Sequence, residues 1–283
     1  MSKRARMEAG GAAGGVLLLF LIWLAAFHVG LLERADRAVF LGFAGLERPR
    51  VNRIASAVVG LCNPKPYLFL CTVVVLVALV RRRLSMAVAI AAILLGANET
   101  TQLLKQLLAE PRSAVATDGV MWVVTASWPS GHATAAMSLA LSAVLAAPPS
   151  LRPLLAGAGG VFAVAVGYSL VTLAEHFPSD VLGGYLVAGT WSMAALAAVF
   201  ALRERLPRAP VADATAQLTV REALRPPVAA LVIALGLALV LALARPHYVI
   251  SYARADEAFV VGAGAIAALG LTVATGVMLT LRR

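Results

Sequence analysis

Residues 84–108 read LSMAVAIAAILLGANETTQLLKQLL, an apolar run that turns polar near its end. As a helix rising about 1.5 Å per residue, this run is long enough to cross the hydrocarbon core of a bilayer. Its last part carries Asn98, Glu99, Gln102 and Lys105. Such side chains cost several kcal/mol each in hydrocarbon unless they face protein or water. The stretch therefore predicts a membrane-spanning helix with a polar site near its carboxyl end.

The composition of the whole chain agrees with this prediction. Of the 283 residues, 61% are apolar and 13% are charged, and the mean hydropathy is +0.87. A soluble or disordered chain carries far more charge. The net charge of +10 could indicate nucleic-acid binding, but the basic residues form small clusters beside the apolar runs, as in membrane proteins. We expect an integral membrane protein whose partner is the lipid bilayer, with no nucleic-acid partner; the oligomeric state stays open.

The apolar runs predict an all-α fold, a polytopic membrane helical bundle. Eight spans are expected, at residues 16–32, 67–80, 84–108, 133–147, 154–173, 181–202, 228–244 and 258–281. The chain then divides into a cytoplasmic N-terminus (1–15), a six-helix membrane core (16–202), a cytoplasmic linker (203–227) and an additional two-helix hairpin (228–283). Residues 33–65 are mixed and basic, which suits either helices on the membrane surface or a solvated connection.

Charge bias sets the expected topology. With the N-terminus inside, most basic clusters, such as Arg81 to Arg83, face the cytoplasm, and both termini lie there. The end of the third span, the start of the fourth and the junction of the fifth and sixth then meet at the extracytoplasmic face. We expect the active site on that side of a bacterial inner (plasma) membrane.

Unusual polar residues occur at all three of these positions. They are Lys105 and Arg112; Ser130, Gly131 and His132; and His176 with Asp180. Two cations and the backbone N–H groups of a helix N-terminus can hold the oxygens of a phosphate. One histidine can attack while the other protonates the leaving oxygen, and a carboxylate four residues from the attacking ring can fix its tautomer. The set predicts an anion site with a nucleophile.

A metal site built from the same residues is less favoured. His132, His176 and Asp180 could supply three ligands, but Lys105 and Arg112 would repel a divalent cation. We therefore expect no metal and no other cofactor.

The three segments resemble the motifs of the type 2 phosphatidic acid phosphatase superfamily, membrane lipid phosphate phosphatases with a fold like that of vanadium haloperoxidases. The family pattern is Lys-x6-Arg-Pro, then Pro-Ser-Gly-His, then Ser-Arg-x5-His-x3-Asp. Here the corresponding segments are Lys105-x6-Arg112, Pro129 to His132, and Ser169-Leu170-x5-His176-x3-Asp180. The first has Ser113 where proline is usual, and the third has Leu170 in place of arginine. The resemblance covers roughly residues 16–202 and implies a six-helix core.

The resemblance also implies a role for each matched residue. His176 would be the nucleophile that becomes a phosphohistidine, Asp180 its partner and His132 the general acid. The implied phosphate ligands are Lys105, Arg112, Ser130 and Gly131. Because Leu170 replaces the motif arginine, that ligand is not carried over. Arginines between Arg34 and Arg53, or Arg245, His247 and Arg254, are candidates to replace it.

The implied function is hydrolysis of a lipid phosphomonoester or pyrophosphate, such as a polyprenyl pyrophosphate, phosphatidic acid or phosphatidylglycerol phosphate, at the extracytoplasmic interface. Two alternatives stay open. One is a lipid-linked phosphotransferase on the same fold. The other is a catalytically impaired binding or scaffold homologue, which the replacement of the motif arginine by Leu170 supports.

Overall fold

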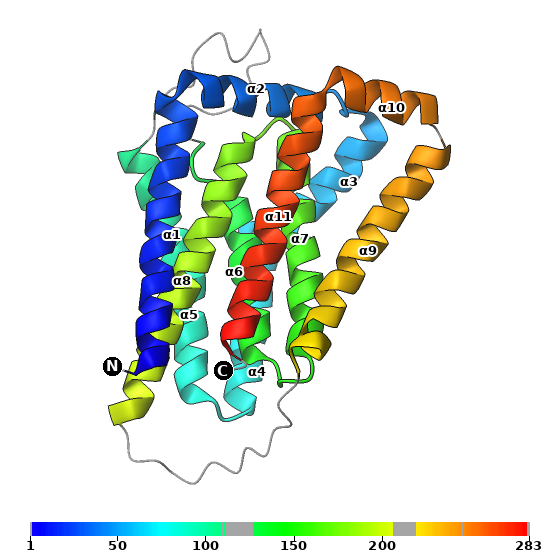
Figure 1. Cartoon of the computed structure of the whole chain (residues 1–283). Helices are drawn as coiled ribbons and strands as arrows, with labels where there is room; N and C mark the ends of the chain where they lie inside the picture. The colour runs from blue at the N-terminus through cyan, green and yellow to red at the C-terminus, as the bar shows by residue number, and fades with distance from the viewer. Residues whose placement is uncertain (1, 109, 111–126, 206–218, 245, 282–283) are drawn as a thin grey trace.

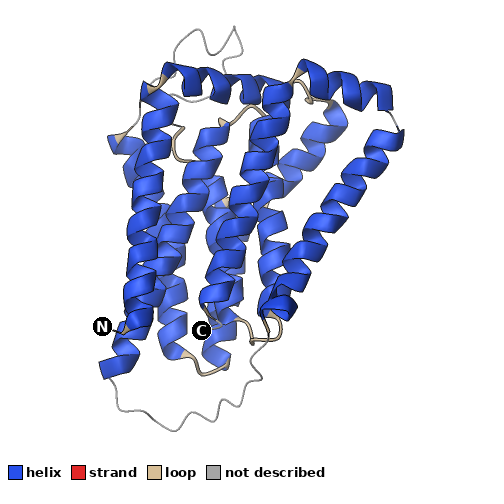
Figure 2. Cartoon of the chain, viewed as in Figure 1, coloured by secondary structure: helices blue, strands red, loops and turns tan. Residues whose placement is uncertain are grey.

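The computed structural model describes residues 2–108, 110, 127–205, 219–244 and 246–281. These residues form eleven α-helices and no strand, so the predicted all-α fold class is confirmed (Figure 2). Most of the helices run side by side along one axis, and the first and last described residues lie at the same end of the bundle (Figure 1).

The first helix, α1 (Lys3–His28), packs along α8 (Pro178–Arg205). It ends before the extended residue Val29, and α2 (Gly30–Ala44) then lies across the end of the bundle (Figure 1). The predicted span 16–32 is therefore wrong at its carboxyl end, because the first helix stops at His28 and residues 30–32 already belong to α2. The predicted cytoplasmic segment 1–15 is already helical from Lys3. Residues 33–65 are expected to form either helices on the membrane surface or a solvated connection, and α2 fits the first possibility.

Helices α3 (Pro49–Gly60) and α4 (Pro64–Val80) form one bent pair. Their axes differ by 47° at the short break between them. Pro64 is the first residue of α4, where its missing N–H leaves no donor unpaired and its fixed φ suits a helix start. The break lies beside α6, against which α4 packs.

The centre of the bundle consists of α5 (Leu84–Leu107), α6 (Gly131–Ala146), α7 (Arg152–Thr172) and α8. The bounds of these helices agree to within three residues with those predicted for 84–108, 133–147, 154–173 and 181–202. Helices α6 and α8 approach closely at Gly184. A Cβ there would lie 2.7 Å from the backbone oxygen of Ser130 and 2.9 Å from the nitrogen of Thr134, so the position requires glycine.

Polar side chains tie the central helices together. Asn98 of α5 donates to the hydroxyl of Tyr67 at 2.8 Å, and that hydroxyl lies 3.1 Å from Ser138 Oγ on α6. The hydroxyls of Thr101 and Thr134 are 3.0 Å apart. Asn98 therefore links α5 to α4, and this bond avoids the cost of burying an unpaired polar group.

The C-terminal helices extend this bundle. Helix α9 (Val220–Ala244) begins inside the predicted linker and packs on α7, and α10 (Pro246–Ala255) lies across the same end as α2 (Figure 1). Helix α11 (Glu257–Thr280) packs against α7, α2 and α8, and contacts α9 much less. A Cβ on Gly160 would lie 2.9 Å from Leu271, and one on Gly270 would lie 2.9 Å from Val164. Close packing at these glycines makes α11 part of the central bundle.

The number of long apolar helices is smaller than the eight predicted spans. In the described part of the chain, α1, α5, α7, α8 and α11 are long and apolar enough to cross a membrane, and the bent pair α3–α4 raises the number to six. Helix α6 is apolar but shorter, since its 16 residues extend about 24 Å. Its amino end starts inside the bundle, where the polar motifs converge.

Candidate active site

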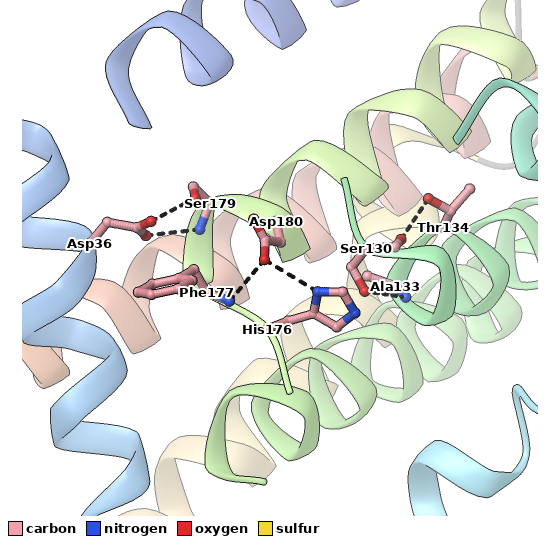
Figure 3. A network of polar contacts seen from close by, with 8 residues as sticks. All are labelled: Asp36, Ser130, Ala133, Thr134, His176, Phe177, Ser179 and Asp180. Carbon is pink, nitrogen blue, oxygen red and sulfur yellow. Dashed lines mark hydrogen bonds and ion pairs between the residues drawn. The ribbon is translucent and has the colours of Figure 1, made fainter. Parts of the chain in front are cut away.

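The turn between α7 and α8 carries His176 and Asp180. Asp180 Oδ2 lies 3.2 Å from His176 Nδ1 and accepts the backbone N–H of Phe177 at 3.0 Å. Asp180 is fully buried and His176 is 8% exposed. Because Nδ1 is bonded to the carboxylate, the ring presents Nε2 as its free nitrogen. In Figure 3 this ring lies between Asp180 and the first turn of α6.

The start of α6 is joined to this turn through the backbone. The N–H of Ser130 donates to the carbonyl of Asp180 at 2.9 Å. The buried Ser130 hydroxyl caps α6 by accepting the N–H of Ala133 at 3.3 Å, so only its proton remains for the predicted role as a phosphate ligand. Within the described chain, no backbone acceptor pairs with the N–H of Gly131 or His132. These two groups are donors available to an anion.

Lys105 approaches the same helix end from α5. A Cβ on Gly131 would lie 3.9 Å from Lys105 Nζ and 3.6 Å from Gln102 Nε2, so both nitrogens surround this glycine. The ammonium of Lys105 is also close enough to Asp180 for electrostatic attraction. Sequence had left the role of Gln102 open, and the fold brings its amide to the candidate phosphate site.

The second histidine lies on the other side of this helix end. His132 is half-buried, and its Nε2 is 3.0 Å from the side-chain oxygen Oδ1 of Asn63, at the break between α3 and α4. His132 is close enough to His176 and Lys105 for like-charge repulsion when these groups are protonated. Six of the seven predicted site residues thus meet: Lys105, Ser130, Gly131, His132, His176 and Asp180.

Helix α2 holds the turn between α7 and α8 from outside. Asp36 accepts the backbone N–H of Ser179 at 2.9 Å and its hydroxyl at 2.6 Å (Figure 3). The rings of Phe40 and Phe177 stack with their centroids 4.6 Å apart. A carboxylate on the first turn of α8 stabilises the helix start and interacts favourably with its dipole.

Leu170 lies on α7 within the apolar core and is fully buried. Of the cations considered as replacements for the motif arginine, His247 and Arg254 line an open pocket with Ile250 and Ser251 on α10. Helix α10 packs on α9 and α11, whereas the candidate site lies between α5, α6 and α8. Arg112, Ser113 and Arg245 lie outside the described residues.

The described residues contain no group of three or more His, Cys, Asp or Glu side chains placed to hold a metal ion. The histidines are bonded instead to Asp180 and Asn63. The set of groups around Gly131 is suited to an anion with several oxygens.

Sequence reasoning missed Asn63 and Asp36. Asn63 precedes a proline in a basic segment, and Asp36 stands between basic residues of a surface helix. Neither belongs to a motif, and their partners lie 69 and 143 residues away. The only available signal was the place of Asp36 between Arg34 and Arg37.

Comparison with known proteins agrees with the fold. Residues 82–204 match the family described as the PAP2 superfamily. The fold is similar to the crystal structure of a transmembrane PAP2-type phosphatidylglycerolphosphate phosphatase from Bacillus subtilis, with a TM-score of 0.57 and 21% sequence identity. The match covers 70% of this chain and 98% of that one. No curated protein matches the chain.

Proposed function

Since residues 82–204 belong to the PAP2 superfamily, we propose that this membrane protein hydrolyses a lipid phosphomonoester or pyrophosphate through a phosphohistidine. The single observation that carries the proposal is the bond between His176 Nδ1 and Asp180 at 3.2 Å. It leaves Nε2 free beside a helix N-terminus that Lys105 also approaches. A nucleophile next to an anion site is the minimum needed for phosphoryl transfer.

The proposed reaction has two displacements. In the first, His176 Nε2 attacks phosphorus, a P–N bond forms, and the P–O bond to the lipid breaks. His132 gives its proton to the leaving oxygen. In the second, water gives its proton back to His132 and attacks the phosphohistidine, which releases phosphate and restores the free ring. Lys105 and the N–H groups of Gly131 and His132 would stabilise the charge on the phosphoryl oxygens.

The substrate candidates share an apolar tail and an interfacial phosphate. A site at the end of a membrane bundle suits lipids whose tails stay in the bilayer, as in polyprenyl pyrophosphates, phosphatidic acid and phosphatidylglycerol phosphate. The last of these is supported by the similar Bacillus subtilis protein, which is a phosphatidylglycerolphosphate phosphatase.

The decisive experiment measures phosphate release from these three lipids by the purified protein and by His176→Ala. We expect wild type to release phosphate from at least one lipid, and His176→Ala from none. Release by both proteins at similar rates would refute the mechanism. Release that requires an added acceptor lipid would favour the phosphotransferase.

A binding or scaffold protein is the second candidate, and the burial of Leu170 within the apolar core favours it. No cation is supplied from that position. Tight binding of a lipid phosphate without turnover, at every lipid tested, would support this candidate over the hydrolase.

We further propose that the site faces the extracytoplasmic side and both termini face the cytoplasm. The basic clusters Lys3 to Arg6 and Arg81 to Arg83 support this orientation. A cysteine at Asp118 should react with an impermeant thiol reagent applied to intact cells, and one at Ala214 should not. Both positions lie outside the described residues. The native Cys62 and Cys71 are buried, so the unaltered protein is the labelling control; the reverse pattern would place the site in the cytoplasm.

A further inference from the structure

The side chain of Asn63 occupies a helix-capping position without capping the helix. Asn63 immediately precedes α4, where asparagine usually accepts an N–H from the second or third helical residue. Here its side chain makes no such bond. The first and third residues of α4 are Pro64 and Pro66, which have no N–H. The sequence therefore removes the partner at the third helical residue, and the N–H of Lys65 at the second is not used, so the Asn63 oxygen is available for another donor.

That donor is His132. Asn63 Oδ1 lies 3.0 Å from His132 Nε2, across 69 residues of sequence. The backbone of Asn63 is anchored on both sides: its N–H donates to Gly60 at 3.2 Å, and its carbonyl accepts the N–H of Tyr67 at 2.9 Å. Tyr67 is in turn tied to Asn98 and Ser138. The backbone that carries this oxygen is thus anchored at the break between α3 and α4 and, through Tyr67, to the central helices.

We propose that Asn63 is a positioning residue that holds His132 by Nε2, so that Nδ1 passes the catalytic proton. This inference rests on the proposed function and deepens it. An amide oxygen only accepts, so it keeps a proton on Nε2 in both charge states of the ring. Nδ1–H then gives its proton to the leaving oxygen as the P–O bond breaks, and neutral Nδ1 takes a proton from the attacking water. The neighbouring ammonium of Lys105 only donates, so it does not supply this acceptor.

The test uses two substrates that differ in their need for an acid. An aryl phosphate with an activated leaving group departs without protonation, whereas a lipid or alkyl phosphate needs it. We expect Asn63→Ala to lower kcat on the lipid by roughly 10- to 100-fold, a part of the usual gain from a general acid, with little change on the aryl phosphate. Equal losses on both substrates would overturn the proposal.

A double-mutant cycle separates positioning from a general structural role. In a His132→Ala background, Asn63→Ala should have no further effect on the lipid, because its target ring is gone. Multiplicative losses in the double variant would overturn the proposal. Asn52→Ala is the matched control, since Asn52 lies on α3 and bonds to Glu47 on the surface. It should leave both activities unchanged.

A conservative variant keeps the test valid if Asn63→Ala does not fold. Asn63→Asp retains an acceptor oxygen at the same distance and should keep the wild-type ratio of lipid to aryl activity. A selective loss on the lipid in Asn63→Asp would refute positioning through the acceptor. Failure of the proposed function itself gives different results. If wild type turns over neither substrate, the protein is not a phosphatase. If His132→Ala loses activity equally on both substrates, His132 is not the general acid. Either result also overturns the role of Asn63.

Discussion

The two histidines of the site lie at the same end of the bundle but are held by different kinds of structure. His176 is 8% exposed and bonds to a carboxylate four residues away. His132 is half-buried and bonds to an amide 69 residues away, at a bend between two helices. The proposed nucleophile is therefore fixed by local sequence and the buried core, whereas the proposed acid depends on a distant and more accessible segment. We expect substitutions around His176 to cost more than those around His132.

The largest effect should come from His176→Ala. Removing the ring removes the atom that forms the bond to phosphorus, so phosphate release should fall to background. The measurement is turnover at high enzyme concentration, with a check by melting that the variant folds. His28→Ala is a control, since His28 pairs with Glu110 on the surface. Substantial residual turnover in His176→Ala would place the nucleophile elsewhere.

Asp180→Asn tests whether the hydrogen bond to the Asp180 carboxylate makes His176 a better nucleophile. The amide should preserve much of the turn but weaken the tautomer control, so we expect kcat to fall by roughly 10²- to 10⁴-fold. This loss should exceed that of Asn63→Ala on the same lipid. Unchanged turnover would reduce Asp180 to a capping residue for α8, and a smaller loss than that of Asn63→Ala would reverse the comparison.

Asp36→Ala probes the outer support of the same turn. Its carboxylate accepts both polar groups of Ser179, and loss of a helix cap usually costs about 1 kcal/mol. We expect kcat to fall by roughly tenfold on the lipid and on an aryl phosphate alike, because the nucleophile serves both substrates. Asp36→Asn should be milder. A loss confined to the lipid would link α2 to the acid instead.

Leu170→Arg tests the apolar core next to the turn that carries His176. Leu170 is fully buried, and a buried charge without a partner costs on the order of 3 kcal/mol. We expect a lower melting midpoint and no gain in kcat/KM, with Leu170→Met close to wild type. A higher kcat/KM for Leu170→Arg would show that this position reaches the phosphate and that the wild-type site is weakened there.

Exhaustive chelation should have the smallest effect, which is none. Both histidines have hydrogen-bond partners, and the site contains the ammonium of Lys105. Turnover measured with and without a chelator should agree within error. Activity that is lost on chelation and restored by one metal ion would show that the two histidines act as ligands.

Much of the fold and half of the site follow from local sequence patterns. Apolar runs predict α5 to α8 to within three residues, since each helix is mostly specified by its own segment. The pair His176 and Asp180 is predictable for the same reason, because a spacing of four residues across a helix start brings two side chains together. The break at Val29 was missed, because its apolar neighbours continue the run while the charges of α2 begin only at Glu33.

The remaining parts of the site depend on how distant segments pack. Asn63 and Asp36 become supports only when α4 lies beside α6 and α2 lies beside α8. No periodicity within residues 33–65 contains that information. The position of Gln102 was predicted only as far as its helical face, and the fold decided that this face meets Gly131.

The place of α11 has a consequence for the order in which the protein is made. A ribosome produces α11 after all the helices that line the site, yet α11 packs against α7 and α8, which carry His176. Tyr168 donates to the carbonyl of Ala263 at 2.7 Å, and Tyr185 packs near Gly270. Until that segment is inserted, the faces of α7 and α8 that pack against α11 lack this partner. The helices on either side of His176 therefore gain their full packing only after α11 has been made and has docked.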